Sequence, residues 1–184
     1  LIFFMLAQCP IIYFHPTGFL KKNGNRFLTL ASSRGHTEIV ALILNALREA
    51  GVDISQSLDK ALKDASVNGH TKIVQLLLNA SQDASFDISQ TLNFANNTGH
   101  TLLMAVSYMG YTEIVQLLLN ALHTAGADIS LALNHADNQG RNALMFASEK
   151  DHTEIVQLLL NALHTAGADI SLALNHADNH GRNA

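Results

Sequence analysis

Proline, cysteine and charged residues are scarce in this chain of 184 residues, and each scarcity excludes a class of protein. The two prolines both precede residue 17, so nothing later in the chain carries a proline that would interrupt a helix. The single cysteine, Cys9, excludes an internal disulfide framework and fits a reducing compartment. Charged residues make up 14% and hydrophobic residues 48%, so the chain can bury an apolar interior and is not a disordered tail.

Signatures of nucleic-acid binding and of catalysis are also missing. No stretch gathers lysine or arginine into a block, and the formal net charge is −4. The sequence lacks a glycine-rich phosphate loop, a Gly-x-Ser-x-Gly motif and a protein-kinase signature. Acidic residues such as Asp128, Asp137 and Glu154 fall at repeated turn and helix-cap positions. We therefore predict no catalytic residues, no cofactor and no nucleic-acid partner.

Histidine is more frequent, with ten residues, but its spacing does not predict a metal site. His135 and His176 recur at equivalent positions, and equivalent positions on neighbouring helices lie about 8–10 Å apart. Zinc holds its histidine nitrogens at about 2.0–2.1 Å, so such a pair cannot share an ion. His176 and His180 have the spacing of half a site, but Gln139 replaces the second histidine in the matching unit. No metal ligand is expected.

The N-terminal residues 1–23 form an apolar segment without a long uninterrupted run. Pro10, Pro16 and Gly18 break it, no positive region precedes it, and a spanning helix needs about 20 residues. We interpret this segment as a cap, or as the remnant of a preceding segment, and the tail of a membrane or signal sequence stays an alternative. The chain begins with Leu1 and breaks off inside a repeat, so we interpret it as a fragment.

A repeat dominates the rest of the chain. Related hexapeptides begin at Gly35, Gly69, Gly110 and Asp151, so their successive offsets are 34, 41 and 41. Asp-Ile-Ser triplets follow with the same offsets, and residues 112–138 and 153–179 are identical over 27 positions, as duplication would produce. The repeat domain is predicted over residues 24–184, with units of about 24–57, 58–98, 99–139 and 140–180 followed by a truncated unit.

Each unit is predicted to contain an antiparallel helix pair. Thr153 offers a hydroxyl for a helix start, and apolar residues then recur at helical spacing until Gly167, where glycine suits a helix end. A shorter helix is predicted over residues 142–150, joined to the longer one at Asp151, where the other units have glycine. Turn-forming residues over 137–141 predict a projecting loop between units.

The first offset is shorter because Asp53-Ile-Ser55 passes almost directly into a predicted helix over Leu58–Ser66. That junction is expected to lack the projecting loop and to interrupt any binding ridge. In the later units, we assign the additional residues to a turn added to the second helix within 158–167 and to residues 131–134.

These motifs resemble the ankyrin repeat. The chain reads Asp137-Asn-Gln-Gly-Arg-Asn-Ala-Leu-Met-Phe-Ala147, then Asp151-His-Thr-Glu-Ile-Val-Gln-Leu-Leu159, then Gly167-Ala-Asp-Ile-Ser171, and the match recurs in four units. The resemblance implies an all-α, ankyrin-type helical-repeat solenoid that serves as a protein-interaction scaffold. Two departures are an offset of 41 against the family's period near 33, and the loss of the family's Pro and His from the first helix. Helix starts are therefore expected to fray.

The duplicated units differ mostly in their loops and first helices. Residues 99–111 and 140–152 differ at most positions, although the sequence that follows them is identical. In ankyrin repeats this region forms the concave face that meets partners, so the resemblance implies that role here. The expected outward residues are His100, Ala105, Tyr108, Met109 and Tyr111 in one unit, and Gln139, Arg141, Phe146, Glu149, Lys150 and His152 in the next. Neutral drift on a solvated face would give the same variation.

The function predicted is the binding of another protein by a monomer in the cytoplasm, without a membrane partner. One alternative is a targeting or regulatory repeat region of a larger enzyme or of a bacterial effector delivered into a host cell, with its catalytic domain outside this sequence. Another is a membrane-tethered scaffold.

Overall fold

The structure is a computed structural model that describes residues 16–83, 87–167, 174 and 177–183. Within these residues the chain forms ten α-helices and no strand, which confirms the predicted all-α fold. The helices are α2 (Pro16–Ser33), α3 (Thr37–Glu49), α4 (Ser55–Val67), α5 (Thr71–Asp83), α6 (Ile88–Asn93), α7 (Leu102–Met109), α8 (Thr112–Thr124), α9 (Ile129–Asn134), α10 (Ala143–Glu149) and α11 (Thr153–Thr165).

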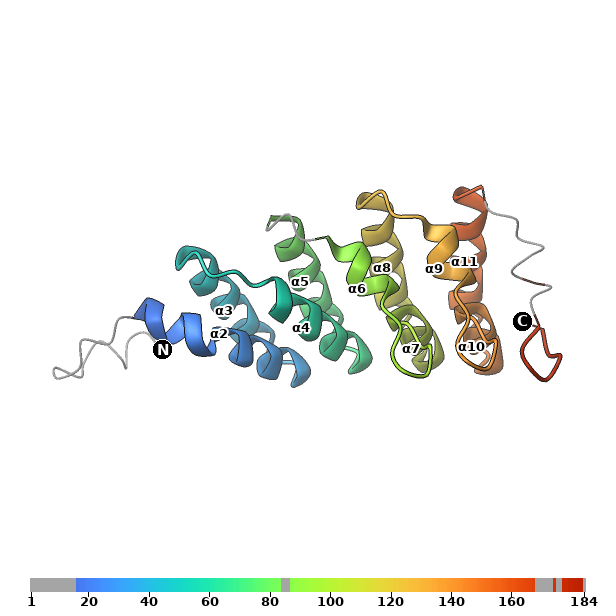
Figure 1. Cartoon of the computed structure of the whole chain (residues 1–184), viewed down its shortest axis with the longest axis horizontal. Helices are drawn as coiled ribbons and strands as arrows, with labels where there is room; N and C mark the ends of the chain where they lie inside the picture. The colour runs from blue at the N-terminus through green and yellow to red at the C-terminus, as the bar shows by residue number, and fades with distance from the viewer. Residues whose placement is uncertain (1–15, 84–86, 168–173, 175–176, 184) are drawn as a thin grey trace.

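Eight of the helices form four antiparallel pairs, which stack side by side in chain order (Figure 1). The first helices contact one another from α2 to α4 to α7 to α10, and the second helices do so from α3 to α5 to α8 to α11. Each pair therefore rests mainly on its neighbours in the sequence, which is the predicted solenoid arrangement.

The second helices supply much of the core. All four second helices have 13 residues: α3, α5, α8 and α11. Their length is therefore the same whether the repeat offset is 34 or 41 residues. Helix α11 begins at Thr153 and ends before Gly167, as predicted, but His152 is the N-cap and no side chain caps the helix. The Thr153 hydroxyl therefore does not have the capping role expected of it. Large side chains on these helices are at most 1% exposed, among them Leu47, Ile73, Leu77, Ile114, Leu118, Leu122, Ile155 and Leu159.

The turn within each pair requires a left-handed residue. Gly35, Gly69 and Gly110 have φ of 76°, 74° and 79°, and Asp151 adopts φ of 59° at the equivalent place. Asp151 is the only non-glycine residue with positive φ among the described residues. Such backbone costs an L-residue about 1–2 kcal/mol, so this turn carries strain that the glycine turns avoid.

The starts of α7 and α10 are capped, contrary to the expected fraying. The Thr101 hydroxyl accepts a hydrogen bond from the Met104 N–H at 3.4 Å, and the Asn142 side chain accepts one from the Met145 N–H at 2.9 Å. Both capping residues are buried. Side-chain oxygens thus satisfy a donor in the first turn of each of these helices, although both helices lack the family's proline.

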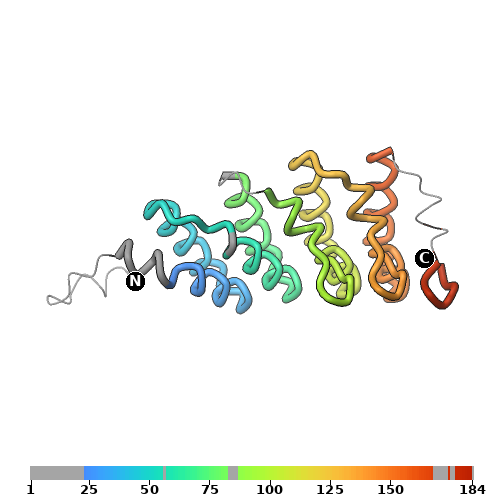
Figure 2. Tube along the Cα trace, viewed as in Figure 1, coloured from blue at the N-terminus to red at the C-terminus, as the bar shows by residue number. Residues whose placement is uncertain are grey.

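The longer repeats contain a short helix and a loop that the shorter repeat lacks. In the later units, the short helices α6 and α9 begin after Asp87 and Asp128, and the carboxylates of these residues cap them. Helix α9 contains residues 131–134, which belong to the predicted insertion. A loop then leads to α7 or α10. After Asp53, by contrast, α4 continues unbroken to Val67. The predicted absence of a projecting loop at this junction is confirmed, and Figure 2 shows loops beside α7 and α10 but none beside α4.

The expected domain boundary at residue 24 falls inside α2, which continues from Pro16 to Ser33. A Cβ atom on Gly24 would clash with Cδ2 of Leu47 on α3, so these two helices approach closely at this glycine. The rest of the apolar segment, residues 1–15 with Cys9, lies outside the described residues, as does His176.

Candidate functional site

Three hairpin loops in the described part of the chain form the ridge beside the first helices. They are closed by backbone hydrogen bonds from Asn96 N to His100 O at 3.0 Å, from Asp137 N to Arg141 O at 2.9 Å, and from Asp178 N to Arg182 O at 2.9 Å. The acid or amide at the first position organises each loop, since its Oδ1 accepts hydrogen bonds from N–H groups two and four residues later. The loops are therefore built alike although their outer side chains differ.

Successive loops are joined by asparagines that recur at the same position of each unit. Asn138 donates from its backbone N to Thr98 O and from Nδ2 to Asn97 O, both at 3.1 Å. Asn179 repeats this pattern on Gln139 O at 2.9 Å and Asn138 O at 3.2 Å. We call this arrangement of Asn97, Asn138 and Asn179 the asparagine ladder. It was missed in the sequence, although the recurrence of the residues was visible there.

A buried carboxylate links two units beneath the ridge. The Asp137 side chain is 1% exposed, and its Oδ2 contacts Arg141 Nη2 at 2.9 Å and His100 Nε2 at 3.0 Å. An ionised carboxylate only accepts hydrogen bonds, so Nε2 of His100 is the donor. Burial raises the pKa of Asp137, but hydrogen bonds from the Arg141 and Gln139 N–H groups and from the Arg141 side chain outweigh this effect and lower it. His100 and Arg141 are thus both positioned by one charge.

Several of the predicted binding residues surround Phe146. Its ring meets the rings of His100 and Tyr108 edge-on, with centroids 5.3 and 6.0 Å away, and the Arg141 guanidinium lies 4.4 Å from its centroid. The Lys150 ammonium lies 4.5 Å from the centroid of the Tyr108 ring. We call these five residues the aromatic–cation cluster. It brings together side chains that the sequence placed in two different units.

Phe146 itself does not face outward as predicted. Its side chain is buried, with the residue 5% exposed, because the rings of the cluster and Arg141 cover it. Phe146 therefore supports the exposed cluster residues instead of presenting its own surface. Ala105, at the same position one unit earlier, is half-buried.

Tyr111 and His152 are also placed differently from the prediction. Both are half-buried between units, because their rings lie against the glycine turn of the preceding pair. A Cβ atom on Gly69 would lie 2.9 Å from the Tyr111 ring, and one on Gly110 would lie 2.6 Å from the His152 ring. His152 Nε2 also contacts Tyr108 O at 3.1 Å. These two rings are thus packed between successive helix pairs.

The other predicted residues are at the surface. Tyr108 is 42% exposed and Met109 45% exposed, while Gln139, Glu149 and Lys150 are exposed and His100 and Arg141 are half-buried. A hydrogen bond with the Tyr108 side chain raises the pKa of Lys150, with a further contribution from the Glu149 carboxylate. The exposed part of this face therefore combines an aromatic ring, a thioether and charges of both signs.

The comparison with protein families agrees with this architecture. The sequence matches the family model for ankyrin repeats, which describes three copies, over residues 5–91 and again over residues 85–174. The chain belongs to the ankyrin-repeat family. No curated protein matches it. Ankyrin repeats are generally protein-interaction modules and are typically non-catalytic.

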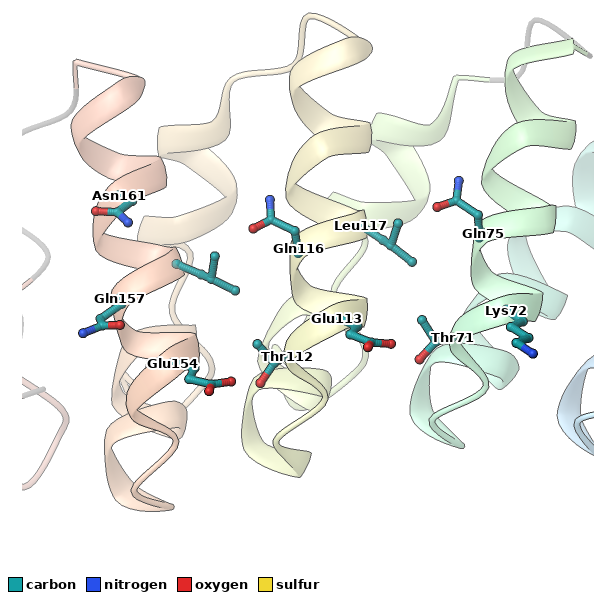
Figure 3. Close-up of a pocket in the computed structure, with 11 residues that line it drawn as sticks. Thr71, Lys72, Gln75, Thr112, Glu113, Gln116, Leu117, Glu154, Gln157 and Asn161 are labelled. Atoms are coloured by element: carbon teal, nitrogen blue, oxygen red, sulfur yellow. The ribbon is translucent and has the colours of Figure 1, made fainter.

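The ankyrin stack carries a hollow on the opposite face, which is made by the second helices. A shallow groove of about 740 Å³ runs across α5, α8 and α11 (Figure 3). Its lining residues are polar or aliphatic and recur along the row: Thr71, Lys72, Gln75, Thr112, Glu113, Gln116, Leu117, Glu154, Gln157, Leu158 and Asn161. Because α8 and α11 have identical sequences, this face repeats itself where the loop face varies.

The described residues form neither a metal site nor a membrane-spanning helix. No group of three or more His, Cys, Asp or Glu side chains in them is arranged to hold a metal ion. None of the described helices has the length and apolar character needed to cross a membrane.

The carboxylate of Asp137 gives a pH-dependent prediction. Because its pKa is lowered in the folded state, the ionised form stabilises the fold above the unfolded pKa of about 3.9. That contribution is lost as the pH falls through the folded pKa. Asp137→Asn should therefore be less stable than the wild type by about 1–3 kcal/mol at pH 7, and should lose less stability between pH 5 and pH 2. Urea unfolding of the wild type and the variant between pH 7 and pH 2 tests both expectations. Parallel pH profiles of stability for the two proteins would contradict the predicted role of the carboxylate.

Proposed function

We propose that this ankyrin domain binds a partner protein through the loop ridge and the exposed parts of α7 and α10. The observation that carries the proposal is the contrast between its two faces. Tyr108, Met109, Glu149 and Lys150 lie exposed where the duplicated units differ, whereas the second-helix face repeats the same side chains. Tyr, Met and Arg are enriched at the centres of protein interfaces.

The aromatic–cation cluster should contribute most of the affinity for the partner protein. Phe146, the buried member of the cluster, contacts Tyr108 and His100, and the buried Asp137 carboxylate contacts His100 and Arg141. Side chains held in place before binding lose less conformational freedom in a complex, so their contacts contribute more to affinity. Tyr108 is the residue of the cluster that offers the most suitable hot spot, since its ring is partly exposed and braced by Lys150.

Paired variants on the two faces test this proposal. The double variant Tyr108→Ala with Lys150→Ala should reduce capture of partner proteins from a lysate of the source organism by about tenfold or more. The matched control, Gln116→Ala with Gln157→Ala on the second-helix face, should leave capture unchanged. Circular dichroism should show equal helicity in both. Capture that survives the first pair, or is lost with the second, would reject the assigned face.

A further inference from the structure

The asparagine ladder has an open first edge. Asn138 and Asn179 each donate two hydrogen bonds to carbonyl oxygens of the loop before them. The loop over residues 94–101 has no loop before it, because α4 is continuous from Ser55 to Val67. Asn97 is exposed, and neither its backbone N–H nor its Nδ2 has an acceptor within the described part of the chain. The two donors of Asn97 that correspond to the bonded donors of Asn138 and Asn179 are therefore unused within the described residues.

Asn96 adds a third donor to this edge. Its Oδ1 already accepts from Thr98 N at 2.9 Å and His100 N at 3.0 Å, so the other end of the amide is Nδ2. At the next loop the same position is Asp137, whose second oxygen accepts a hydrogen bond from His100 of the preceding loop. The change from carboxylate to amide reverses the chemistry. The second oxygen of Asp137 accepts a hydrogen bond, whereas Nδ2 of Asn96 donates one and requires an acceptor.

An exposed aromatic ring lies at the same edge. Phe94 is 60% exposed and occupies the repeat position of His135, which is half-buried and whose Nε2 contacts Gly99 O of the preceding loop at 3.1 Å. No such loop covers Phe94. Instead, the Lys63 ammonium of α4 lies 4.3 Å from the centroid of its ring. Phe94 is thus an apolar surface that the missing loop leaves open to an incoming chain.

Lys63, which contacts Phe94, also lines a hollow of about 750 Å³ between α2 and α4. Three cations, Arg26, Lys60 and Lys63, and two carboxylates, Asp59 and Asp64, line it. Lys63 and Asp59 form an ion pair at 3.0 Å. Arg26 and Lys60 are exposed, and the cations that line the hollow outnumber the carboxylates by one.

We propose that this open edge binds an acidic, extended segment of the partner protein, which takes the place of the missing loop. The inference rests on the proposed function and specifies the partner's chemistry. Main-chain carbonyls of the segment accept from Asn97 N and Nδ2, a carboxylate accepts from Asn96 Nδ2 and pairs with Lys60, and an aliphatic side chain covers Phe94. The repeat offsets of 34 and 41 set the length, since the segment replaces the stretch of chain by which they differ.

Selection of random heptapeptides, which match that difference in length, against the whole chain tests the inference without knowledge of the partner. Asp or Glu next to an aliphatic residue should be enriched. A fluorescent peptide of the enriched sequence should bind about tenfold or more weakly to Asn97→Asp and to Lys60→Gln. Gln116→Glu, on the second-helix face, alters the charge by the same amount as either variant and should bind as the wild type does.

The outcomes separate this inference from the proposed function. If the selected peptides bind Asn97→Asp normally but lose affinity for Tyr108→Ala with Lys150→Ala, the loop face is confirmed and the open edge is rejected. The absence of acidic enrichment also overturns the inference. So does concentration-dependent self-association that Asn97→Asp abolishes, which would identify a second copy of the chain as the occupant. Binding of a labelled oligonucleotide that Lys60→Gln abolishes would overturn it in favour of a phosphate ligand.

Discussion

Replacing Leu118 by alanine is expected to lower the free energy of unfolding by about 2–5 kcal/mol. The side chain lies on α8, is 1% exposed, and belongs to the continuous apolar core. Helix α8 contacts α5 on one side and α11 on the other, so the cavity would open in the middle of the row. Urea unfolding followed by circular dichroism gives the loss, since the midpoint should fall while the slope stays constant.

The duplication supplies an internal repeat of this experiment. Leu159 is the residue equivalent to Leu118 in the next unit and is also 1% exposed, so Leu159→Ala should lose an amount in the same range. Leu131, on α9, is 62% exposed, and Leu131→Ala should change stability by no more than about 0.5 kcal/mol. Losses below about 1 kcal/mol for both buried leucines would show that these helices are not interior.

The helix pairs were predictable because their signals are local. The apolar spacing after Thr153 and the glycine at Gly167 mark one helix, and α11 follows them closely. The passage from Asp53 into the next helix without turn-forming residues predicted the loopless junction at α4. A turn was expected at Asp151 because three other units have glycine there, and its positive φ of 59° fits such a turn. Each of these features depends on a few neighbouring residues.

The directions of side chains in the short first helices were not predictable in the same way. All five residues from Ala143 to Ala147 are apolar and buried, so this stretch contains no polar residue that would show which side faces out. Whether Phe146 is covered depends on Tyr108 and His100 in the preceding unit. Likewise, Tyr111 and His152 face inward because the glycine turn of the preceding unit leaves room for a ring. Such contacts require knowledge of how the units stack.

Replacing Gly110 by alanine should therefore lower the free energy of unfolding by more than the cost of the left-handed backbone alone. The left-handed backbone, with φ of 79°, costs an L-residue about 1–2 kcal/mol. In addition, the new Cβ atom would lie 2.6 Å from Cε1 of His152, and displacing a packed ring costs about 1–3 kcal/mol. We expect a total loss of about 2–5 kcal/mol in urea unfolding.

Gly126 provides the matched control for the backbone contribution. It has φ of 66°, and a Cβ atom there would meet nothing within 4 Å. Gly126→Ala should therefore lose only the conformational cost of about 1–2 kcal/mol. The reverse substitution, Asp151→Gly, should raise stability by about 0.5–1 kcal/mol, because relief of the strain exceeds the entropy that glycine adds to the unfolded chain.

A double-mutant cycle then isolates the contact between units. If the His152 ring is what Gly110→Ala displaces, the same substitution made in a His152→Ala background should cost no more than Gly126→Ala does. The difference between the two backgrounds should be about 1–3 kcal/mol, which is the coupling expected of residues in direct contact. Equal costs in both backgrounds would show that the ring does not rest on this turn. The glycine would then serve the turn alone, and the stacking of the units would depend on the helices and the asparagine ladder.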